Sequence, residues 1–147
     1  MKDKRINAED VAYWKSSTTS PDTWIDRAKK IIVQAGGIVL ADGFGQDNEG
    51  RAAYMLAFSF GDERFKIVWP VLPSKSGNGK AARIQAATCL YHDVKARAVS
   101  AKVLGFRAAY LTYWLLPDGR TASEAASPEL VEATPRLLMA GEVNRGG

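Results

Sequence analysis

The segment Lys75-Ser-Gly-Asn-Gly-Lys-Ala-Ala-Arg83 decides how the surrounding sequence is interpreted, because it joins a Gly-rich, basic loop to the start of a helix. From Lys80 to Leu104 the chain is rich in Ala and contains neither Gly nor Pro, which predicts one long helix. Asn78 suits the N-cap position of this helix. Its first turn would offer free backbone N–H groups and a positive dipole end beside several cations. The segment therefore favours a phosphate group as a ligand.

Three stretches before this segment have the composition of β-strands. Large apolar residues alternate with smaller ones in the middle stretch, at Tyr54, Leu56, Phe58 and Phe60. The expected strands are Ile38–Ala41, Ala53–Phe60 and Phe65–Trp69. A loop at 42–50 and a tight turn at 61–64 separate them, which predicts an antiparallel meander. Pro70 and Pro73 end the pairing of the third strand or place it at a sheet edge.

A helix is expected on the N-terminal side of these strands, over Pro21–Ala35. Ser20 suits the N-cap and Pro21 the first helical position, and the pair Gly36-Gly37 ends the helix. Its apolar residues recur at helical spacing, at Trp24, Ala28, Ile31, Ile32 and Ala35. Closer to the N-terminus, Asn7 resembles a helix start and Ala8–Lys15 predicts a short helix.

The region after the long helix is less regular. Phe106–Leu116 has the composition of a buried strand or of a further helix, and its two adjacent Ala residues favour the helix. Pro117–Arg120 predicts a turn. Single helical turns are expected at Thr121–Ala126 and at Pro128–Ala133, before a frayed tail.

These elements predict an α+β fold, with a three-stranded antiparallel meander packed on helices and short helices near both ends. The core follows the order α-β-β-β-α over residues 21–105, with extensions at 1–20 and 106–147. A chain of 147 residues is long enough to form one domain with a core of its own. We therefore expect a single domain over residues 1–147.

Composition excludes several classes of protein. Cys89 is the single cysteine, which rules out an intramolecular disulfide and a Cys-based zinc site. No apolar run approaches the ~18 residues of a membrane span. The charged N-terminus lacks the apolar segment of a signal peptide. We expect a cytoplasmic protein with no membrane partner and no cofactor.

The charges are distributed unevenly along the chain. Residues 51–110 carry ten Lys or Arg and three Asp or Glu, a net charge of +7, whereas residues 1–50 sum to −1 and residues 111–147 to −2. Clustered cations indicate a polyanionic partner. The alternative is that these cations only solvate the outer face of a helix.

No catalytic or metal-binding constellation competes with this interpretation. The segment around Lys80 resembles a nucleotide-binding P-loop, but Ser74 replaces its first Gly and Ala81 its final Ser or Thr. Cys89 and His92 lie one helical turn apart and could approach each other on the expected helix. A Cys in a helix is more often a small buried side chain than part of a catalytic pair. His92 and Asp93 are adjacent, so on a helix they point in different directions.

The acidic residues are interpreted in the same way. Asp42, Asp47 and Glu49 do not have the spacing of a calcium-binding loop. Asp62 and Glu63 lie in a tight turn. Exposure of the turn to solvent explains these two acidic residues better than a nuclease site does. We therefore expect no catalytic residues, no metal ligands and no enzymatic activity.

The expected order, with a Gly-rich basic loop before its last helix, resembles two families over about residues 20–105. Ser76–Ala87 is similar to the loop and Lys-rich helix start with which the double-stranded-RNA-binding domain spans phosphates, although only one Lys stands at this helix start. The meander Ala53–Trp69 and the helix start Lys80–Thr88 are similar to the single-strand DNA-annealing proteins of phages and of eukaryotic recombination. Those proteins share a helix–meander–helix core and assemble into rings or filaments.

The resemblance implies single-stranded DNA binding and annealing by a homo-oligomer, with a ring as one expected form of that oligomer. A double-stranded-RNA-binding module is the first alternative, and a protein-interaction or structural protein is the second. Aromatic residues on the strands are more often core than base-stacking groups, and Trp69 is the best stacking candidate. The expected nucleic-acid-binding residues are Lys66, Trp69, Lys75, Asn78, Lys80, Arg83, Lys95, Arg97 and Lys102.

Overall fold

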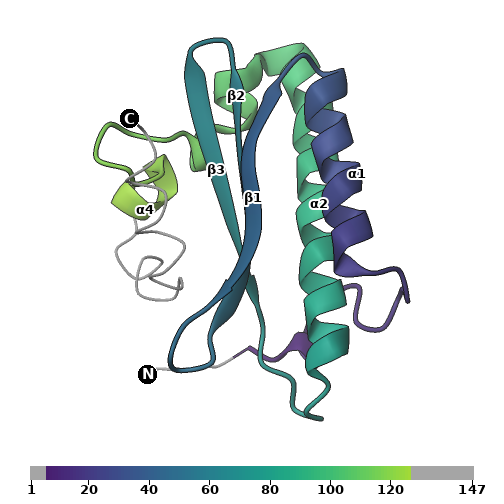
Figure 1. The fold of residues 1–147 in the computed structure, drawn as a ribbon. Coiled ribbons are helices and arrows are strands. Elements are labelled where there is room, and N and C mark those ends of the chain that lie inside the picture. Colours follow the sequence, from purple (N-terminus) through teal and green to yellow (C-terminus); the bar gives the residue numbers. More distant parts are fainter. Residues whose placement is uncertain (1–5, 127–147) are drawn as a thin grey trace.

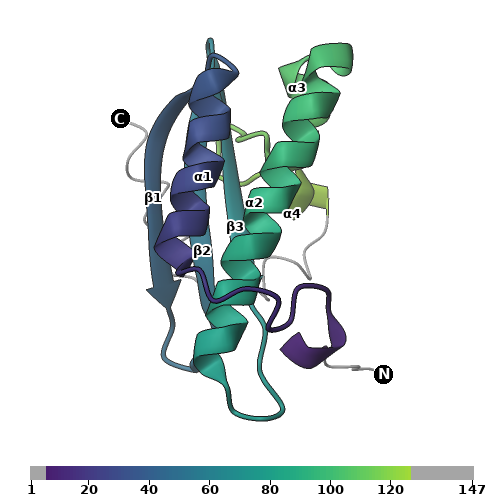
Figure 2. The ribbon, with the colours of Figure 1, turned by 90° about the vertical axis from the view of Figure 1, so that its right-hand side faces the viewer.

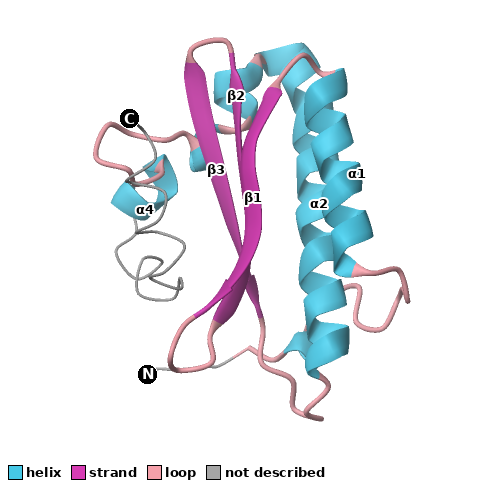
Figure 3. Cartoon of the chain, viewed as in Figure 1, coloured by secondary structure: helices cyan, strands magenta, loops and turns pink. Residues whose placement is uncertain are grey.

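A three-stranded sheet with helices on both sides organises the chain, as a computed structural model describes it for residues 6–126 (Figures 1 and 3). The predicted α+β class is confirmed. Two long helices and three strands follow the predicted order: α1 (Pro21–Gln34), β1 (Ile38–Gln46), β2 (Ala52–Phe60), β3 (Glu63–Val71) and α2 (Gly79–Leu104). The shorter helices are η1 (Ala8–Asp10), α3 (Phe106–Ala109), η2 (Leu111–Tyr113) and α4 (Ala122–Ala126).

The sheet is an antiparallel meander in the order β1-β2-β3. Helices α1 and α2 lie side by side on one of its faces and run in the same direction, whereas α4 lies on the other side (Figures 1 and 2). The starts of both long helices and the β1–β2 turn lie toward the same end of the molecule. This arrangement brings segments that are far apart in the sequence to one end.

The core lies between the sheet and the two long helices. Tyr54, Leu56, Phe58 and Phe60 of β2 all point into it, as their alternation predicts. The helices contribute small and branched side chains, chiefly Ile25, Ala28 and Ile32 from α1 and Ala87, Leu90 and Val94 from α2. Each large apolar side chain that is fully buried stabilises the fold by about 1.5–3 kcal/mol. The central strand therefore anchors both helices.

The predicted caps of the long helices are confirmed. The Ser20 hydroxyl accepts a hydrogen bond from the Thr23 N–H at 3.3 Å, and Pro21 occupies the first turn of α1. The Asn78 carboxamide oxygen accepts a hydrogen bond from the Ala81 N–H at 3.0 Å. These side chains satisfy backbone donors that have no partner within their helix.

Strand β1 is longer than the sequence indicated. The predicted strand ended at Ala41, and the residues after it were expected to form a loop. In the structure, pairing with β2 continues to Gln46, opposite Ala52, after an irregularity between Val39 and Ala41. The long partner strand provides hydrogen-bonding groups all along this edge, which overrides the turn propensity of the glycines.

The short helix predicted at Ala8–Lys15 is wrong beyond its first turn. Only Ala8–Asp10 is helical, and Tyr13 and Lys15 have φ angles of 70° and 54°. Such left-handed conformations cannot continue a right-handed helix. The Gln85 side chain of α2 instead donates to the backbone carbonyls of three residues of this segment, Ala8, Val11 and Ala12.

The ambiguous segment after α2 contains both types of structure. Phe106–Ala109 and Leu111–Tyr113 are helical, as favoured, but the chain then extends, and Trp114 forms a bridge with Phe65 on the outer edge of β3. The helical turn expected at Thr121–Ala126 is present as α4. The turn expected at Pro128–Ala133 lies outside the described residues.

Candidate nucleic-acid interface

The first turn of α2 presents two cations to solvent. Lys80 and Arg83 are both exposed, and neither forms an ion pair with any residue between 6 and 126. The guanidinium carbon of Arg83 lies 5.9 Å from the centre of the Phe44 ring on β1. Because the helix dipole adds positive potential at this end, an anion is favoured here.

The loop before α2 shows directly which chemistry it favours, because it binds a carboxylate of its own chain. Glu9 accepts hydrogen bonds from the hydroxyls of Ser74 (2.6 Å) and Ser76 (2.7 Å). It also accepts them from the backbone N–H groups of Lys75 (2.9 Å) and Ser76 (3.1 Å). The Ser74 hydroxyl, followed by the other donors, holds the pKa of Glu9 well below its usual range.

The two remaining predicted residues of this loop have structural partners. The Lys75 ammonium lies 3.5 Å from the Asp10 carboxylate, and its side chain is 59% exposed, so it remains accessible. Asn78 uses its carboxamide oxygen to cap α2. Asn78 therefore positions the helix start, whereas Lys75 belongs to the exposed cationic surface.

The structure corrects the prediction for Lys66, which was expected to bind nucleic acid. It lies on the face of β3 opposite the core residues Phe65 and Ile67, as the alternation requires, but that face is also covered. Its exposed fraction is 1%, and its cross-strand neighbour Ala57 is equally buried. Lys66 as placed cannot reach a phosphate group.

Arg97 is a second correction. Its guanidinium donates to the Asp93 carboxylate and to the backbone carbonyl of Ala109, both at 2.9 Å. It also lies 4.7 Å from the Tyr113 ring centre, and the Tyr113 hydroxyl donates to the same Asp93. Burial, followed by the nearby Asp93 charge, raises the pKa of Tyr113. Arg97 therefore ties α2 to the segment after it and is not an exposed phosphate ligand.

The three remaining predicted residues are Lys95, Lys102 and Trp69. Lys95 and Lys102 are exposed on the middle and the last turn of α2, and the Lys95 ammonium lies 5.9 Å from the Tyr91 ring centre. Trp69 is half-buried against the core and pairs across the sheet with Tyr54. Lys75, Lys80 and Arg83 thus lie in the loop and the first turn of α2, Lys95 and Lys102 lie farther along the helix, and the Trp69 side chain is half-buried.

An aromatic stack on α2 was missed in the sequence. The Tyr13 and His92 rings are 4.6 Å apart and nearly parallel, at 7°. Trp24 and Tyr91 border this pair, with ring centres 6.0 Å and 5.0 Å from that of His92. Tyr13 is 39% exposed and stands in a left-handed conformation that costs of order 1–3 kcal/mol. No local pattern in the sequence connects Tyr13 to His92.

Two reactive side chains of the described region, Cys89 and Glu63, have ordinary structural environments. Burial raises the pKa of the Cys89 thiol, whereas a nucleophilic Cys requires a lowered pKa. The Glu63 carboxylate forms an ion pair with the Arg107 guanidinium. Residues 6–126 contain no group of three His, Cys, Asp or Glu side chains arranged to hold a metal ion.

Comparison with known proteins found no matching family model, no matching curated protein and no matching solved structure. Within the described region, none of the helices combines the length and the apolar character required to cross a lipid bilayer.

Proposed function

We propose that this protein is a cytoplasmic, non-catalytic single-stranded DNA-binding protein that assists annealing as a homo-oligomer. The observation that carries the proposal is the exposed cationic surface formed by Lys75, Lys80 and Arg83 around the start of α2. The loop in this surface binds the Glu9 carboxylate through two hydroxyls and two backbone N–H groups. A phosphate oxygen accepts hydrogen bonds from the same donors.

Aromatic side chains along α2 supply the second requirement for a single strand. The N-terminal segment is held against α2 by Gln85, and it places the partly exposed Tyr13 ring on His92. An unpaired base has a free face that stacks on such a ring, and each stacked base contributes about 1–3 kcal/mol. Lys95, exposed on the next turn of α2, would meet the adjoining phosphate backbone.

Duplex RNA is the main alternative, because three segments meet at one end of the fold. The starts of α1 and α2 and the β1–β2 turn lie toward that end, so a rod-shaped ligand could span them (Figures 1 and 2). However, Asp22 and Asp26 stand on α1, and Asp47 and Glu49 follow β1. Asp47 and Glu49 pair with Arg51, and Asp26 pairs with Lys29, whereas Asp22 forms no ion pair with any residue of the described region. The charge of Asp22 repels a second line of phosphates, which favours a flexible single strand on the α2 side.

Self-association is supported by apolar side chains that remain at the surface. Val99, Val103 and Leu104 of α2 are 64%, 81% and 64% exposed. Ile38 and Leu40 lie exposed on β1, whose outer edge has no paired strand among the described residues. Exposed apolar groups and a free strand edge are features of protein–protein contacts.

The test is a titration of the full chain with three fluorescent ligands of equal length: single-stranded DNA, duplex DNA and duplex RNA. We expect single-stranded DNA to bind most tightly and its affinity to fall steeply as salt rises, because bound cations release counterions. Mass in solution is measured with and without the oligonucleotide. Tighter binding of duplex RNA would favour the alternative, and a flat salt response for all three would refute a phosphate-binding surface.

A further inference from the structure

The anion site in the loop before α2 is occupied by a side chain from the N-terminal part of the chain. One oxygen of the Glu9 carboxylate accepts hydrogen bonds from the Ser74 hydroxyl and from the hydroxyl and the N–H of Ser76, at 2.6, 2.7 and 3.1 Å. The other oxygen accepts one from the Lys75 N–H at 2.9 Å. Successive backbone N–H groups in a turn form the concave anion sites of phosphate-binding loops. A phosphate group therefore cannot use these donors while Glu9 is bound.

The backbone on either side of Glu9 is held independently of its carboxylate. The Ala8 N–H donates to the Pro73 carbonyl at 2.8 Å, and Ala8 is fully buried. The Gln85 side chain of α2 donates to three backbone carbonyls of residues 8–12. Glu9 itself is only partly buried, so its side chain has solvent beside it. Departure of the carboxylate thus requires a rotamer change of one side chain and leaves the backbone contacts in place.

The Glu9 carboxylate resembles the group that it excludes. A carboxylate and a phosphodiester each carry a negative charge on two oxygens that accept hydrogen bonds from hydroxyl and N–H donors. The adjacent Asp10 carboxylate lies 3.5 Å from the Lys75 ammonium, so this part of the chain also pairs with the cation of the loop. Both partners of that ion pair are about half exposed, at 59% and 49%, and such pairs contribute little. Glu9 is therefore the principal competitor for the loop.

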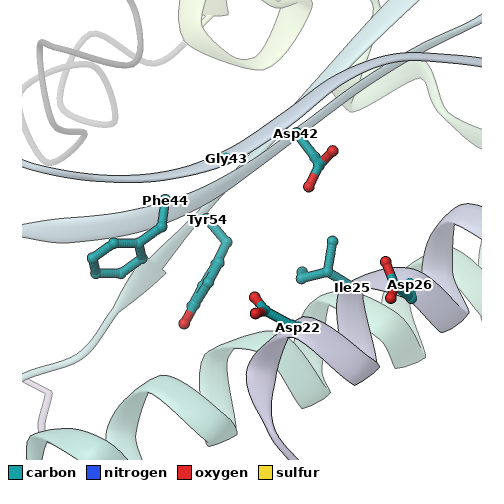
Figure 4. A pocket seen from close by; sticks show the side chains of 7 residues that line it. All are labelled: Asp22, Ile25, Asp26, Asp42, Gly43, Phe44 and Tyr54. Atoms are coloured by element: carbon teal, nitrogen blue, oxygen red, sulfur yellow. The ribbon is translucent and has the colours of Figure 1, made fainter.

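A groove between α1 and β1 has the opposite preference. Its volume is about 270 Å³, and the side chains of Asp22, Asp26 and Asp42 line it (Figure 4). The Lys29 ammonium lies 3.2 Å from Asp42 and 3.5 Å from Asp26. Because carboxylates repel a phosphate group, we expect no phosphate to bind there. The groove is therefore an internal reference for an experiment on the loop.

We propose that Glu9 is an autoinhibitory side chain, whose carboxylate closes the loop site at residues 74–76 until a phosphate group of a nucleic acid displaces it. The inference rests on the proposed function, because it takes the phosphate from a nucleic-acid backbone, and it adds a regulatory step to that function. Only molecules in which Glu9 has left the site are competent to bind. The apparent affinity for phosphate is reduced by the fraction of molecules in that state.

The test titrates the full chain with inorganic phosphate at constant ionic strength and follows the amide NMR signals of Lys75 and Ser76. Glu9→Ala empties the site and should bind phosphate about tenfold more tightly than the parent chain. Glu9→Gln keeps a neutral oxygen in the site and should gain less, about threefold, because hydrogen bonds to an uncharged acceptor are weaker. The amide signals of Asp26 and Asp42, in the groove of Figure 4, should not shift.

Two further variants separate occupancy of the site from charge. Asp10→Asn removes a negative charge from the adjacent residue and leaves Glu9 in the loop, so its phosphate affinity should stay within about twofold of the parent. Ser76→Ala, added to Glu9→Ala, removes a donor that phosphate would use and should cancel most of the gain. Circular dichroism confirms that each variant is folded.

Equal phosphate affinity in the parent and in Glu9→Ala, or an equal gain in Asp10→Asn, would overturn the proposal. Single-stranded DNA titrated in parallel separates this failure from a failure of the proposed function. If DNA binds the parent and Glu9→Ala equally, with the signals of Lys75 and Ser76 unchanged, DNA binding stands and Glu9 does not compete with it. If phosphate binds Glu9→Ala more tightly while DNA binds no variant, the autoinhibitory contact is confirmed and the proposed function is wrong.

Discussion

The first turn and the second half of α2 carry cations that look alike in the sequence and behave differently in the fold. At its start, Lys80 and Arg83 reach solvent with no carboxylate partner in the described region. In its second half, Arg97 is bound to Asp93 and to the Ala109 carbonyl. The difference shows that the partners that the fold supplies decide whether a cation holds the structure together or remains available to a ligand.

The largest effect is expected for Arg97 in the second half of α2, and it concerns the stability of the fold. Arg97→Ala removes two charge-assisted hydrogen bonds and leaves Asp93, whose side chain is 23% exposed, without its cation. We expect the free energy of unfolding to fall by about 2–3 kcal/mol, measured by chemical denaturation.

Lys102→Ala is the control for Arg97→Ala, because Lys102 is an exposed cation on the same helix. Its effect on stability should stay within about 0.5 kcal/mol. If Arg97→Ala were as stable as the parent chain but lost affinity for DNA, Arg97 would have the same role as Lys80 and Arg83. That result would contradict the difference between the two parts of α2.

The second-largest effect is expected at the start of α2, and it concerns the binding of an oligonucleotide. Lys80→Ala with Arg83→Ala should reduce the salt slope of oligonucleotide binding by about two units, because each lost phosphate contact contributes about one. Stability should change by no more than about 0.5 kcal/mol, since both side chains are exposed. A fluorescence titration at several salt concentrations, with circular dichroism for folding, measures both quantities.

The matched control for this pair is Lys30→Ala with Arg64→Ala. It removes the same charges from exposed positions on α1 and near the β2–β3 turn. Equal loss of affinity in both double variants would mean that only net charge matters and that the start of α2 is not the site.

Sequence periodicity predicted the helices and the meander well, because the core pattern of β2 and the caps at Ser20 and Asn78 depend on near neighbours. The full length of β1 was missed, since pairing with a distant strand decides it. Two of the residues expected to bind nucleic acid, Lys66 and Arg97, have other environments in the fold for the same reason. Burial of Lys66 and the ion pair of Arg97 depend on tertiary contacts that no local pattern reports.

The contact between Glu9 and the loop before α2 is the clearest such case. Sequence composition indicated an anion-binding loop, but the first anion there comes from the chain itself, far away in the sequence. The motif therefore indicated a loop that binds anions, but it gave no information about the Glu9 carboxylate that the loop binds in the structure. It follows that the availability of the α2 start to phosphate depends on how firmly Glu9 is held.

The smallest effect is expected from Glu9→Gln, and it concerns pH. The hydroxyl of Ser74, then that of Ser76 and the two backbone N–H groups, lower the pKa of Glu9 in the folded chain. In the unfolded chain the same group titrates near its ordinary value of about 4.3. The unfolded state therefore binds more protons below that pH, and the stability that Glu9 contributes is present above it and declines as the pH falls.

Denaturation of the parent chain and of Glu9→Gln between pH 6 and pH 3 measures this contribution, with Asp62→Asn as a control carboxylate in the β2–β3 turn. The stability difference between parent and Glu9→Gln should narrow toward pH 3. At neutral pH the same variant removes a negative charge that competes with phosphate, so its oligonucleotide affinity should rise. A stability difference independent of pH, with unchanged affinity, would mean that Glu9 does not hold the loop, and the start of α2 would then be open to phosphate without competition.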